Sequence, residues 1–110
     1  MEKQLEELGL SRNEARIYLF LLRKGETSTG PIIKETGIAN SRVYESLNSL
    51  IEKGLVSFNI QRKCKYFKAN EPKALLEREK GKLDKIESIM PKLTEIMSLK
   101  QKETDMAIYD

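Results

Sequence analysis

The chain has 110 residues, of which 34% are charged and 6% are aromatic, and its formal net charge is +3. This length suffices for one small domain and an additional element, and it excludes two domains with separate cores. Because aromatic residues are scarce, the core has to be mainly aliphatic. Histidine is absent and Cys64 is the single cysteine, which excludes an intrachain disulfide and the usual Cys/His metal cages. We therefore expect no metal and no cofactor.

Positive charge is unevenly distributed along the chain. Lys and Arg balance Asp and Glu in residues 1–39 and 72–110, so the whole excess lies in residues 40–71. A local basic excess is typical of a phosphate-binding surface. The N-terminus is charged from Glu2 onward, and no apolar run approaches the length of a membrane span. The sequence thus predicts a soluble cytoplasmic protein without a membrane partner.

The N-terminal third predicts two helices. Residues 2–8 form a short helical pattern with Leu5 and Leu8 as its apolar contacts. Ser11 and Glu14 have the spacing of a capping box, which predicts a second helix from Arg12 to about Lys24. Because its apolar residues run consecutively, this second helix is expected to be central and covered on several sides.

A third, short helix is predicted after an extended segment at residues 26–29, which favours one short strand. Ser28 or Thr29 is suited to cap this helix, and Pro31 then lies in its first turn, where a missing N–H is harmless. Gly37 closes the helix, and a fourth one follows after a tight turn. Two short helices joined in this way predict a helix-turn-helix.

The fourth helix, expected over residues 40–53, is the element around which the chain is organised. Asn40 or Ser41 is suited to cap its start, and Gly54 to end it. Apolar residues at helical spacing predict a buried stripe formed by Val43, Leu47, Leu50 and Ile51. The other face is small and polar, as in a helix that lies in the DNA major groove, although an ordinary amphipathic surface helix shares this pattern.

Residues 55–70 change to an alternating pattern that predicts a β-hairpin. This hairpin carries no acidic residue, and its expected tip at residues 61–65 is basic. A basic hairpin directly after a helix-turn-helix is typical of a wing, which lies on the DNA backbone or in the minor groove. The alternative is a solvated hairpin whose lysines protect an edge strand.

These motifs carry a resemblance to a known family. The runs LGLSRNEARIYLFLL, TGIANSRVYESLNSLIEKGLVSF and KYFKANEPKALL occur in the order and spacing of the DNA-binding half of the TrmB-like transcriptional regulators, a mainly archaeal winged-helix family. The resemblance covers roughly residues 5 to 76. One departure is Gly30 and Pro31 at the start of the third helix, where the family more often has alanine and a longer helical start. The resemblance implies a winged helix-turn-helix fold and DNA binding.

The last third predicts a long, coiled-coil-like helix that begins near Pro72. Its apolar seam follows a heptad register, and a second copy of the chain is the simplest partner for it. The dimer interface is expected to comprise Leu76, Leu83, Ile86, Ile89, Met90, Leu93, Ile96 and Met97. The alternative is that the seam packs back onto its own domain. Pro91 removes one internal hydrogen bond, so we expect a kink in a largely continuous helix.

The expected organisation is a winged helix-turn-helix domain (1–71), a dimerisation helix (72–104) and a tail (105–110), giving a mainly α fold with a small β-hairpin. In the resembled family, a sugar-recognising domain usually follows such a helix, and Ala107–Tyr109 resemble the start of a strand that would enter it. The chain is thus either naturally short or a shortened relative. No small-molecule effector site is evident, and we predict no sugar binding, which calorimetry tests.

The sequence therefore predicts a homodimeric, sequence-specific regulator that binds double-stranded DNA. Base edges would be contacted by Ser41, Arg42 and Glu45, with Arg42 able to grip a guanine in bidentate fashion. The DNA backbone would be contacted by Asn40, Tyr44, Asn48, Ser49, Arg62, Lys63 and Lys65. Tyr44 could also be half-buried against the wing.

Three other functions stay open at this point. An architectural, chromatin-like protein would use the same basic surface without base preference. A redox-responsive regulator would use Cys64, because nearby cations favour its thiolate. A winged helix used for protein contacts alone fits less well with a basic wing. An enzyme is not expected, since the sequence offers no histidine, no phosphate-binding glycine loop and no nucleophile with a visible base.

Overall fold

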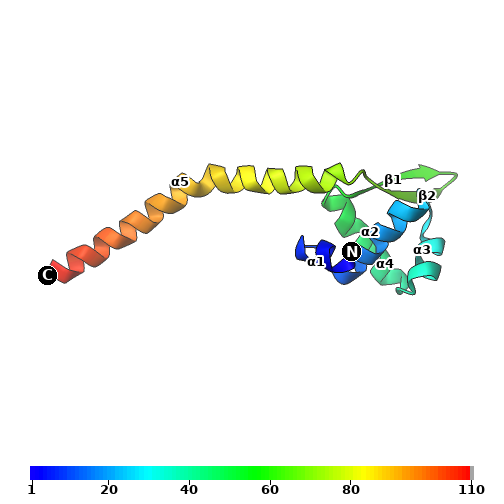
Figure 1. Cartoon of the computed structure of the whole chain (residues 1–110), viewed down its shortest axis with the longest axis horizontal. Helices are drawn as coiled ribbons and strands as arrows, with labels where there is room; N and C mark the ends of the chain where they lie inside the picture. The colour runs from blue at the N-terminus through cyan, green and yellow to red at the C-terminus, as the bar shows by residue number, and fades with distance from the viewer. Residues whose placement is uncertain (110) are drawn as a thin grey trace. The chain divides into compact units, whose positions relative to one another are not determined.

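The computed structural model describes the backbone of residues 1–109 and the side chains of residues 1–102. It divides the chain into two compact units, Met1–Leu76 and Glu77–Asp110. The elements, shown in Figure 1, are α1 (Glu2–Glu7), α2 (Arg12–Lys24), α3 (Thr29–Thr36), α4 (Asn40–Glu52), β1 (Val56–Gln61), β2 (Cys64–Ala69) and α5 (Lys73–Tyr109). The expected fold class, mainly helical with a small hairpin and a long C-terminal helix, is confirmed. Within the described part of the chain, no helix combines the length and apolarity needed to cross a membrane.

Helix α2 is the centre of the first unit. Its start is fixed by the expected capping box, in which Ser11 Oγ accepts from the Glu14 backbone N–H (3.1 Å) and Glu14 Oε1 accepts from the Ser11 N–H (2.8 Å). The helix contacts α1, α3, α4 and β2, as its apolar run predicted. Coverage is nevertheless incomplete, because Leu22 is 41% exposed.

Helix α1 covers α2 with one of its two expected contacts. Leu5 is buried, whereas Leu8 is 40% exposed, so the expectation for Leu8 is wrong. The reason is that α1 ends at Glu7, and the chain turns at Leu8 and Gly9. Leu10 follows the turn and is buried in the core.

Helices α3 and α4 form the expected helix-turn-helix. Helix α3 ends at Gly37, which has a left-handed φ of 71°, and Arg16 Nη2 of α2 donates to the Thr36 carbonyl at 2.5 Å. Helix α4 starts at Asn40, but its N-cap is Ala39, which has no side-chain acceptor. The expectation that Asn40 or Ser41 caps this helix is therefore wrong, because both residues already lie within it.

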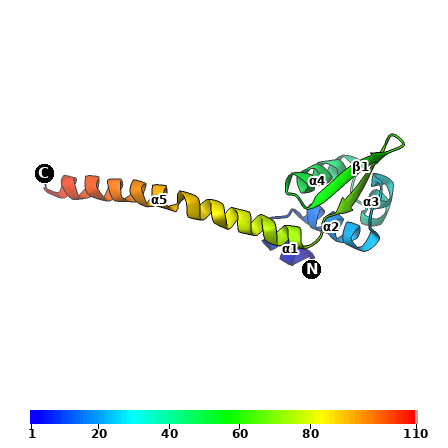
Figure 2. The same ribbon diagram turned by 90° about the horizontal axis from the view of Figure 1, so that it is seen from above.

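Strands β1 and β2 form an antiparallel hairpin with Val56 opposite Ala69 and Gln61 opposite Cys64. Figures 1 and 2 show the hairpin alongside the helices, with its turn extending beyond them. Thr27 adds a single bridge to Phe67 on the outer edge of β2, so the expected short strand is reduced to one residue pair. The base of the hairpin is closed by Asn70, whose Nδ2 donates to the Gly54 carbonyl at 2.7 Å.

The core of the first unit is aliphatic apart from Tyr18 and Phe67. Every element from α1 to β2 contributes to it. Its fully enclosed large side chains are Tyr18, Ile17, Leu21, Ile32, Leu47, Leu50, Leu55 and Val43. One buried polar atom within the described residues has no hydrogen-bond partner, the hydroxyl of Tyr18. Because the core joins α2, α4 and the hairpin, it fixes the exposed face of α4 relative to the wing.

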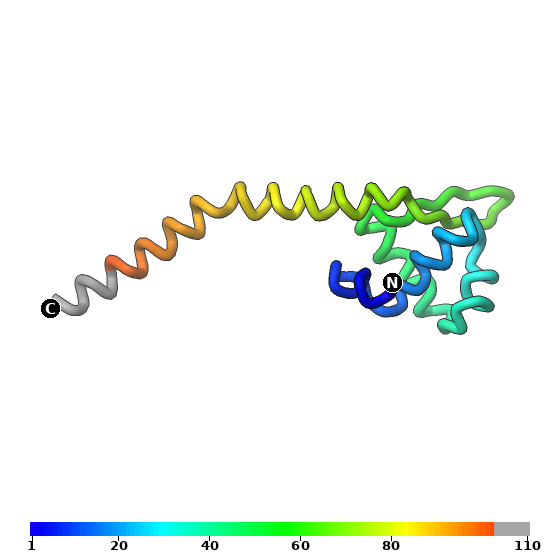
Figure 3. The backbone as a smooth tube through the Cα atoms, in the orientation of Figure 1, coloured from blue at the N-terminus to red at the C-terminus, as the bar shows by residue number. Residues whose placement is uncertain are grey.

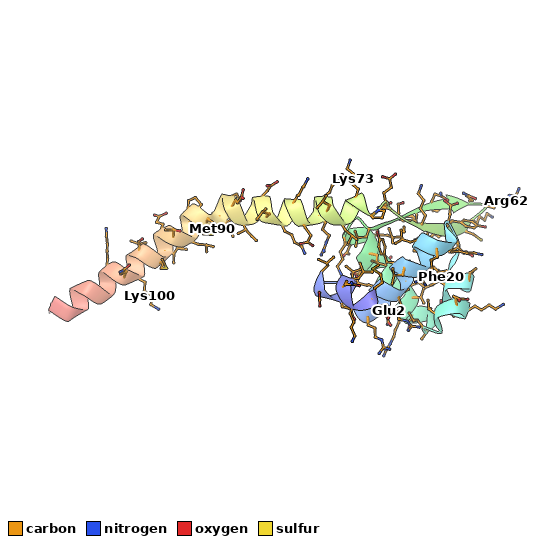
Figure 4. All side chains as sticks on the ribbon, in the orientation of Figure 1. Glu2, Phe20, Arg62, Lys73, Met90 and Lys100 are labelled. Carbon is orange, nitrogen blue, oxygen red and sulfur yellow. The ribbon has the colours of Figure 1, made fainter. Side chains whose placement is uncertain are left out.

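Helix α5 continues through Pro91 as a single helix. Figures 3 and 4 show that it changes direction near Met90, beside the proline, so the expected kink in a continuous helix is confirmed. The helix is assigned as far as Tyr109, so the strand expected at Ala107–Tyr109 is wrong. Asp110 lies outside the described residues.

Candidate nucleic-acid interface

The exposed face of α4 presents one outward row of polar side chains. Ser41, Glu45, Asn48 and Glu52 are all exposed, and their spacing of four, three and four residues places them along one line of the helix. The opposite line is buried and consists of Val43, Ser46, Leu47 and Leu50. The core thus orients α4 so that short polar groups, rather than apolar ones, face outward.

A shallow hollow of about 450 Å³ lies on one side of this row, between α4 and the start of α2. It is lined by Ser11, Asn13, Glu14, Arg42, Glu45, Ser46 and Ser49. Two of the expected base-contacting residues, Arg42 and Glu45, therefore line the side of α4 that adjoins α2, whereas Ser41 does not. Glu45 of the outward row therefore lines the hollow together with the buried groups that hold α4 in place.

Those buried groups centre on Glu14. Its Oε2 accepts from Lys53 Nζ at 2.6 Å and from Ser49 Oγ at 2.9 Å, and Lys53 also donates to the Gly9 carbonyl. Burial alone would raise the pKa of Glu14, but the hydrogen bonds from Lys53, Ser11 and Ser49 together lower it below its ordinary value. Ser49, which the sequence assigned to the DNA backbone, here binds a carboxylate that anchors α4 to α2.

The start of α4 adjoins α3 rather than the hairpin. Tyr44 is 43% exposed, and its hydroxyl lies 3.4 Å from Thr29 Oγ1 at the start of α3. The Tyr44 hydroxyl thus contacts α3, and half-burial of its ring against the wing stays a prediction. Asn40 is exposed in the first turn. Since Ala39 provides no side-chain acceptor, the first N–H groups of α4 lack a side-chain cap.

The tip of the hairpin is a two-residue turn made of Arg62 and Lys63. Both residues have positive φ, 49° and 66°, as the twist of a tight hairpin requires. Such positions usually hold Asn or Gly, so two cations occupy them at a conformational cost. Figure 4 shows Arg62 at the end of the hairpin, projecting into solvent. Lys65 lies on β2, and its Nζ is 4.8 Å from the centre of the Phe58 ring.

Glu26 supports one face of the hairpin. Its carboxylate accepts from Asn59 Nδ2 at 3.1 Å and from Gln61 Nε2 at 3.2 Å, and Gln61 also donates to Asn59. Cys64, the candidate redox residue, is exposed beside the turn and lies opposite Gln61. The sequence did not indicate the role of Glu26, because Asn59 and Gln61 lie more than thirty positions after it along the chain.

The seam of α5 is exposed along its whole predicted length. The exposed fractions range from 47% at Ile89 to 66% at Met97. The other predicted seam residues fall between these values: Leu76, Leu83, Ile86, Met90, Leu93 and Ile96. Leu99 is also 55% exposed, and the heptad register places it off the seam.

A helix-turn-helix with a polar outward row, followed by a basic hairpin, defines a winged-helix DNA-binding domain of the kind found in transcription regulators. Residues 5–73 match the model of a family described as "Sugar-specific transcriptional regulator TrmB". The chain belongs to the TrmB family. The resemblance inferred from the sequence motifs is therefore confirmed.

Similar proteins agree with this assignment. TrmBL1 of Pyrococcus furiosus, described as an HTH-type sugar sensing transcriptional regulator, is 39% identical over 54 residues, which cover 49% of this chain and 16% of TrmBL1. The structure of TrmBL2, described as an archaeal chromatin protein, matches with a TM-score of 0.63 at 22% identity, covering 99% of this chain and 39% of TrmBL2. The chain thus spans less than half the length of these two relatives.

A bacterial regulator shows how widely the architecture is shared. A MarR-family transcriptional regulator from Silicibacter pomeroyi matches with a TM-score of 0.59 at 17% identity, covering 93% of this chain and 75% of that one. At this identity the match shows the fold alone. The winged-helix fold is therefore common to both families. The match carries no information about which surface residues contact DNA bases.

Proposed function

We propose that this protein is a homodimeric, sequence-specific DNA-binding transcription regulator. The observation that carries this proposal is the combination of an outward polar row on α4 with a hairpin that has two cations at its tip and no acidic residue. A row of short polar side chains fits the base edges of a major groove. The cations at the tip of the wing fit the phosphates beside it.

Base readout is assigned to Ser41, Arg42 and Glu45, as the sequence suggested, with Asn48 added. Asn48 lies on the same outward line as Ser41 and Glu45, which supports a base contact more than a backbone contact. An asparagine side chain can recognise adenine through its N6 and N7 atoms, and a good bidentate contact contributes about 1–3 kcal/mol of discrimination. Ser49 is assigned a positioning role, because its hydroxyl binds Glu14.

The DNA backbone is assigned to Asn40 and Tyr44 at the start of α4 and to Arg62, Lys63 and Lys65 in the wing. These contacts would give affinity that weakens with salt and does not depend on sequence. Exposure of Asn40 and the half-exposed ring of Tyr44 support this role. Arg62 and Lys63 support it most directly, since two cations hold turn positions that favour other residues.

Dimerisation is assigned to the exposed seam of α5. Nonpolar side chains that recur in a heptad register and stay about half-exposed in a single chain are suited to pair with an identical helix. Two winged-helix domains joined in this way would address a two-fold symmetric DNA site, with half-sites separated by whole helical turns.

Selection from a pool of genomic fragments at two salt concentrations, with the molar mass recorded alongside, tests this proposal. We expect a dimer to enrich one two-fold symmetric sequence. In the same assay, Arg42→Ala should lose affinity mainly for that sequence, by about 5- to 150-fold, because it removes one base contact. Equal loss on every sequence would assign Arg42 to the backbone, and absence of any enrichment would overturn sequence-specific binding.

A second candidate function is architectural DNA binding without base preference. Its support is the structural match with TrmBL2, which is described as a chromatin protein. The ratio of specific to non-specific affinity distinguishes the two functions: a ratio near one in the selected pool selects the architectural function, and a ratio above about 1,000 selects the regulator.

A further inference from the structure

One face of the hairpin carries large apolar side chains into solvent. The register places Val56, Phe58 and Ile60 of β1 on the same face as their partners Ala69, Phe67 and Lys65 of β2. Burial falls along this face: Val56 and Phe67 are 2% exposed, Phe58 is 45% exposed and Ile60 is 63% exposed. The face therefore begins in the core and ends, beside the basic turn, as an uncovered apolar strip of Phe58 and Ile60.

Contact with the core accounts for the position of Phe58, the inner residue of this strip, but not for that of Ile60. The Phe58 ring lies 6.2 Å from that of Phe67, centre to centre, and Lys65 Nζ lies over the Phe58 ring. Ile60 follows two residues further out, beyond this aromatic contact. A β-branched aliphatic residue at this position favours the strand but leaves apolar area in water, which is unfavourable.

On the opposite face of the hairpin, the polar residues of β1 are hydrogen-bonded within the chain. Asn59 and Gln61 bind Glu26, and Ser57 Oγ donates to Asn70 Oδ1 at 2.9 Å. These contacts tie β1 to Glu26, just before α3, and to Asn70 at the base of the hairpin. The two faces of the wing therefore differ, because one is tied to the domain and the other presents apolar groups among cations.

We propose that the strip of Phe58 and Ile60 is the part of the wing that enters the DNA minor groove, with Ile60 packed against deoxyribose. This inference rests on the proposed DNA binding and adds an affinity component that does not depend on salt. Minor-groove proteins combine cations with apolar side chains in this way. A second copy of the chain is a poorer occupant, because two tips carrying Arg62, Lys63 and Lys65 would repel each other.

The experiment compares Ile60→Thr with Arg62→Ala in binding to a mixed-sequence duplex over a range of salt concentrations. Ile60→Thr keeps a β-branched residue in the strand and should weaken binding by about 3- to 30-fold at every salt concentration, leaving the salt slope unchanged. Arg62→Ala should instead reduce the slope by about 0.9, the value for one lost phosphate contact. Cys64→Thr, on the other face beside the turn, is the matched control and should bind like the wild type.

Netropsin, which occupies AT-rich minor grooves, gives a second readout. It should compete with the wild type more strongly than with Ile60→Thr. Wild-type affinity of Ile60→Thr, or a changed molar mass with unchanged DNA affinity, would overturn the inference. Failure of the wild type to bind this duplex or any fragment of the genomic pool would overturn the proposed function, so the two failures are distinguishable.

Discussion

The two units of the chain differ in how far their apolar side chains are buried. In the first unit, apolar side chains from α1 to β2 converge, and those of the core are at most 6% exposed. In α5, leucine, isoleucine and methionine recur just as regularly but stay 47–66% exposed along the seam. A single helix has no second layer to cover its apolar stripe, and isolated helices are marginal in water. The first unit thus covers its own apolar side chains, whereas the seam of α5 is left exposed in a single chain, which is why we propose an identical helix as its partner.

A leucine-to-alanine substitution should have the largest effect on stability, and its effect should differ between the two units. Leu50→Ala, at a fully buried position of α4, should lower the free energy of unfolding by about 2–5 kcal/mol, because it leaves a cavity in a closed core. Leu93→Ala, at a half-exposed seam position, should act through dimerisation and depend on protein concentration. Thermal unfolding at several concentrations measures both effects. A concentration-independent loss of stability for Leu93→Ala would mean that the seam packs within its own chain.

A charge placed in the seam should break the proposed dimer. Ile86→Lys puts a cation at a central heptad position and should yield a monomer whose affinity for a two-fold DNA site falls by about 100-fold or more, since the two half-sites are then bound separately. Leu99→Lys is the control, because Leu99 is similarly exposed but lies off the seam. Light scattering gives the molar mass of both variants. A dimeric Ile86→Lys would place the interface elsewhere.

Within the first unit, the Glu14 network should give a pH-dependent contribution to stability. Because the folded state lowers the pKa of Glu14, the contribution is fully present above the ordinary carboxyl pKa and is lost as the pH falls through the folded-state pKa. Glu14→Gln should therefore cost about 1–3 kcal/mol at neutral pH, and the difference from the wild type should narrow under acid conditions.

Chemical denaturation from neutral pH to below pH 4 measures this difference. Glu45→Gln, which removes an exposed carboxylate from the same side of α4, serves as the control and should change stability by less than about 0.5 kcal/mol. If the difference for Glu14→Gln stayed constant across the pH range, a neutral hydrogen bond rather than the charge would account for it.

The comparison also explains which features the sequence could predict. Signals that act within a few residues were predictable: the capping box of Ser11 and Glu14, the closure of α4 before Gly54, and the alternation of the hairpin. These features depend on local hydrogen bonds and on periodicity, which a sequence displays directly. The kink at Pro91 belongs to the same class, since it follows from one missing N–H.

Features that depend on contacts between distant segments were not predictable. Ser49 reads as a surface serine, but its partner Glu14 lies 35 residues earlier. Ala39 is the N-cap of α4 although it has no side-chain acceptor, so capping preference alone did not locate the start of this helix. Likewise, alternation identified the hairpin, but only the burial of its inner end showed that Ile60 is uncovered.

The smallest expected effect on stability concerns the one buried polar atom that has no hydrogen-bond partner among the described residues. The Tyr18 hydroxyl is buried without a hydrogen-bond partner, and burial raises its pKa above the ordinary value. Removing an unsatisfied buried hydroxyl relieves its desolvation cost, so Tyr18→Phe should raise the free energy of unfolding by up to about 1 kcal/mol. Tyr44→Phe, at a half-exposed ring beside Thr29, is the control and should leave stability within about 0.5 kcal/mol. Denaturant titrations of both variants measure these differences. A clear loss of stability in Tyr18→Phe would contradict this expectation and show that the hydroxyl has a hydrogen-bond partner in solution.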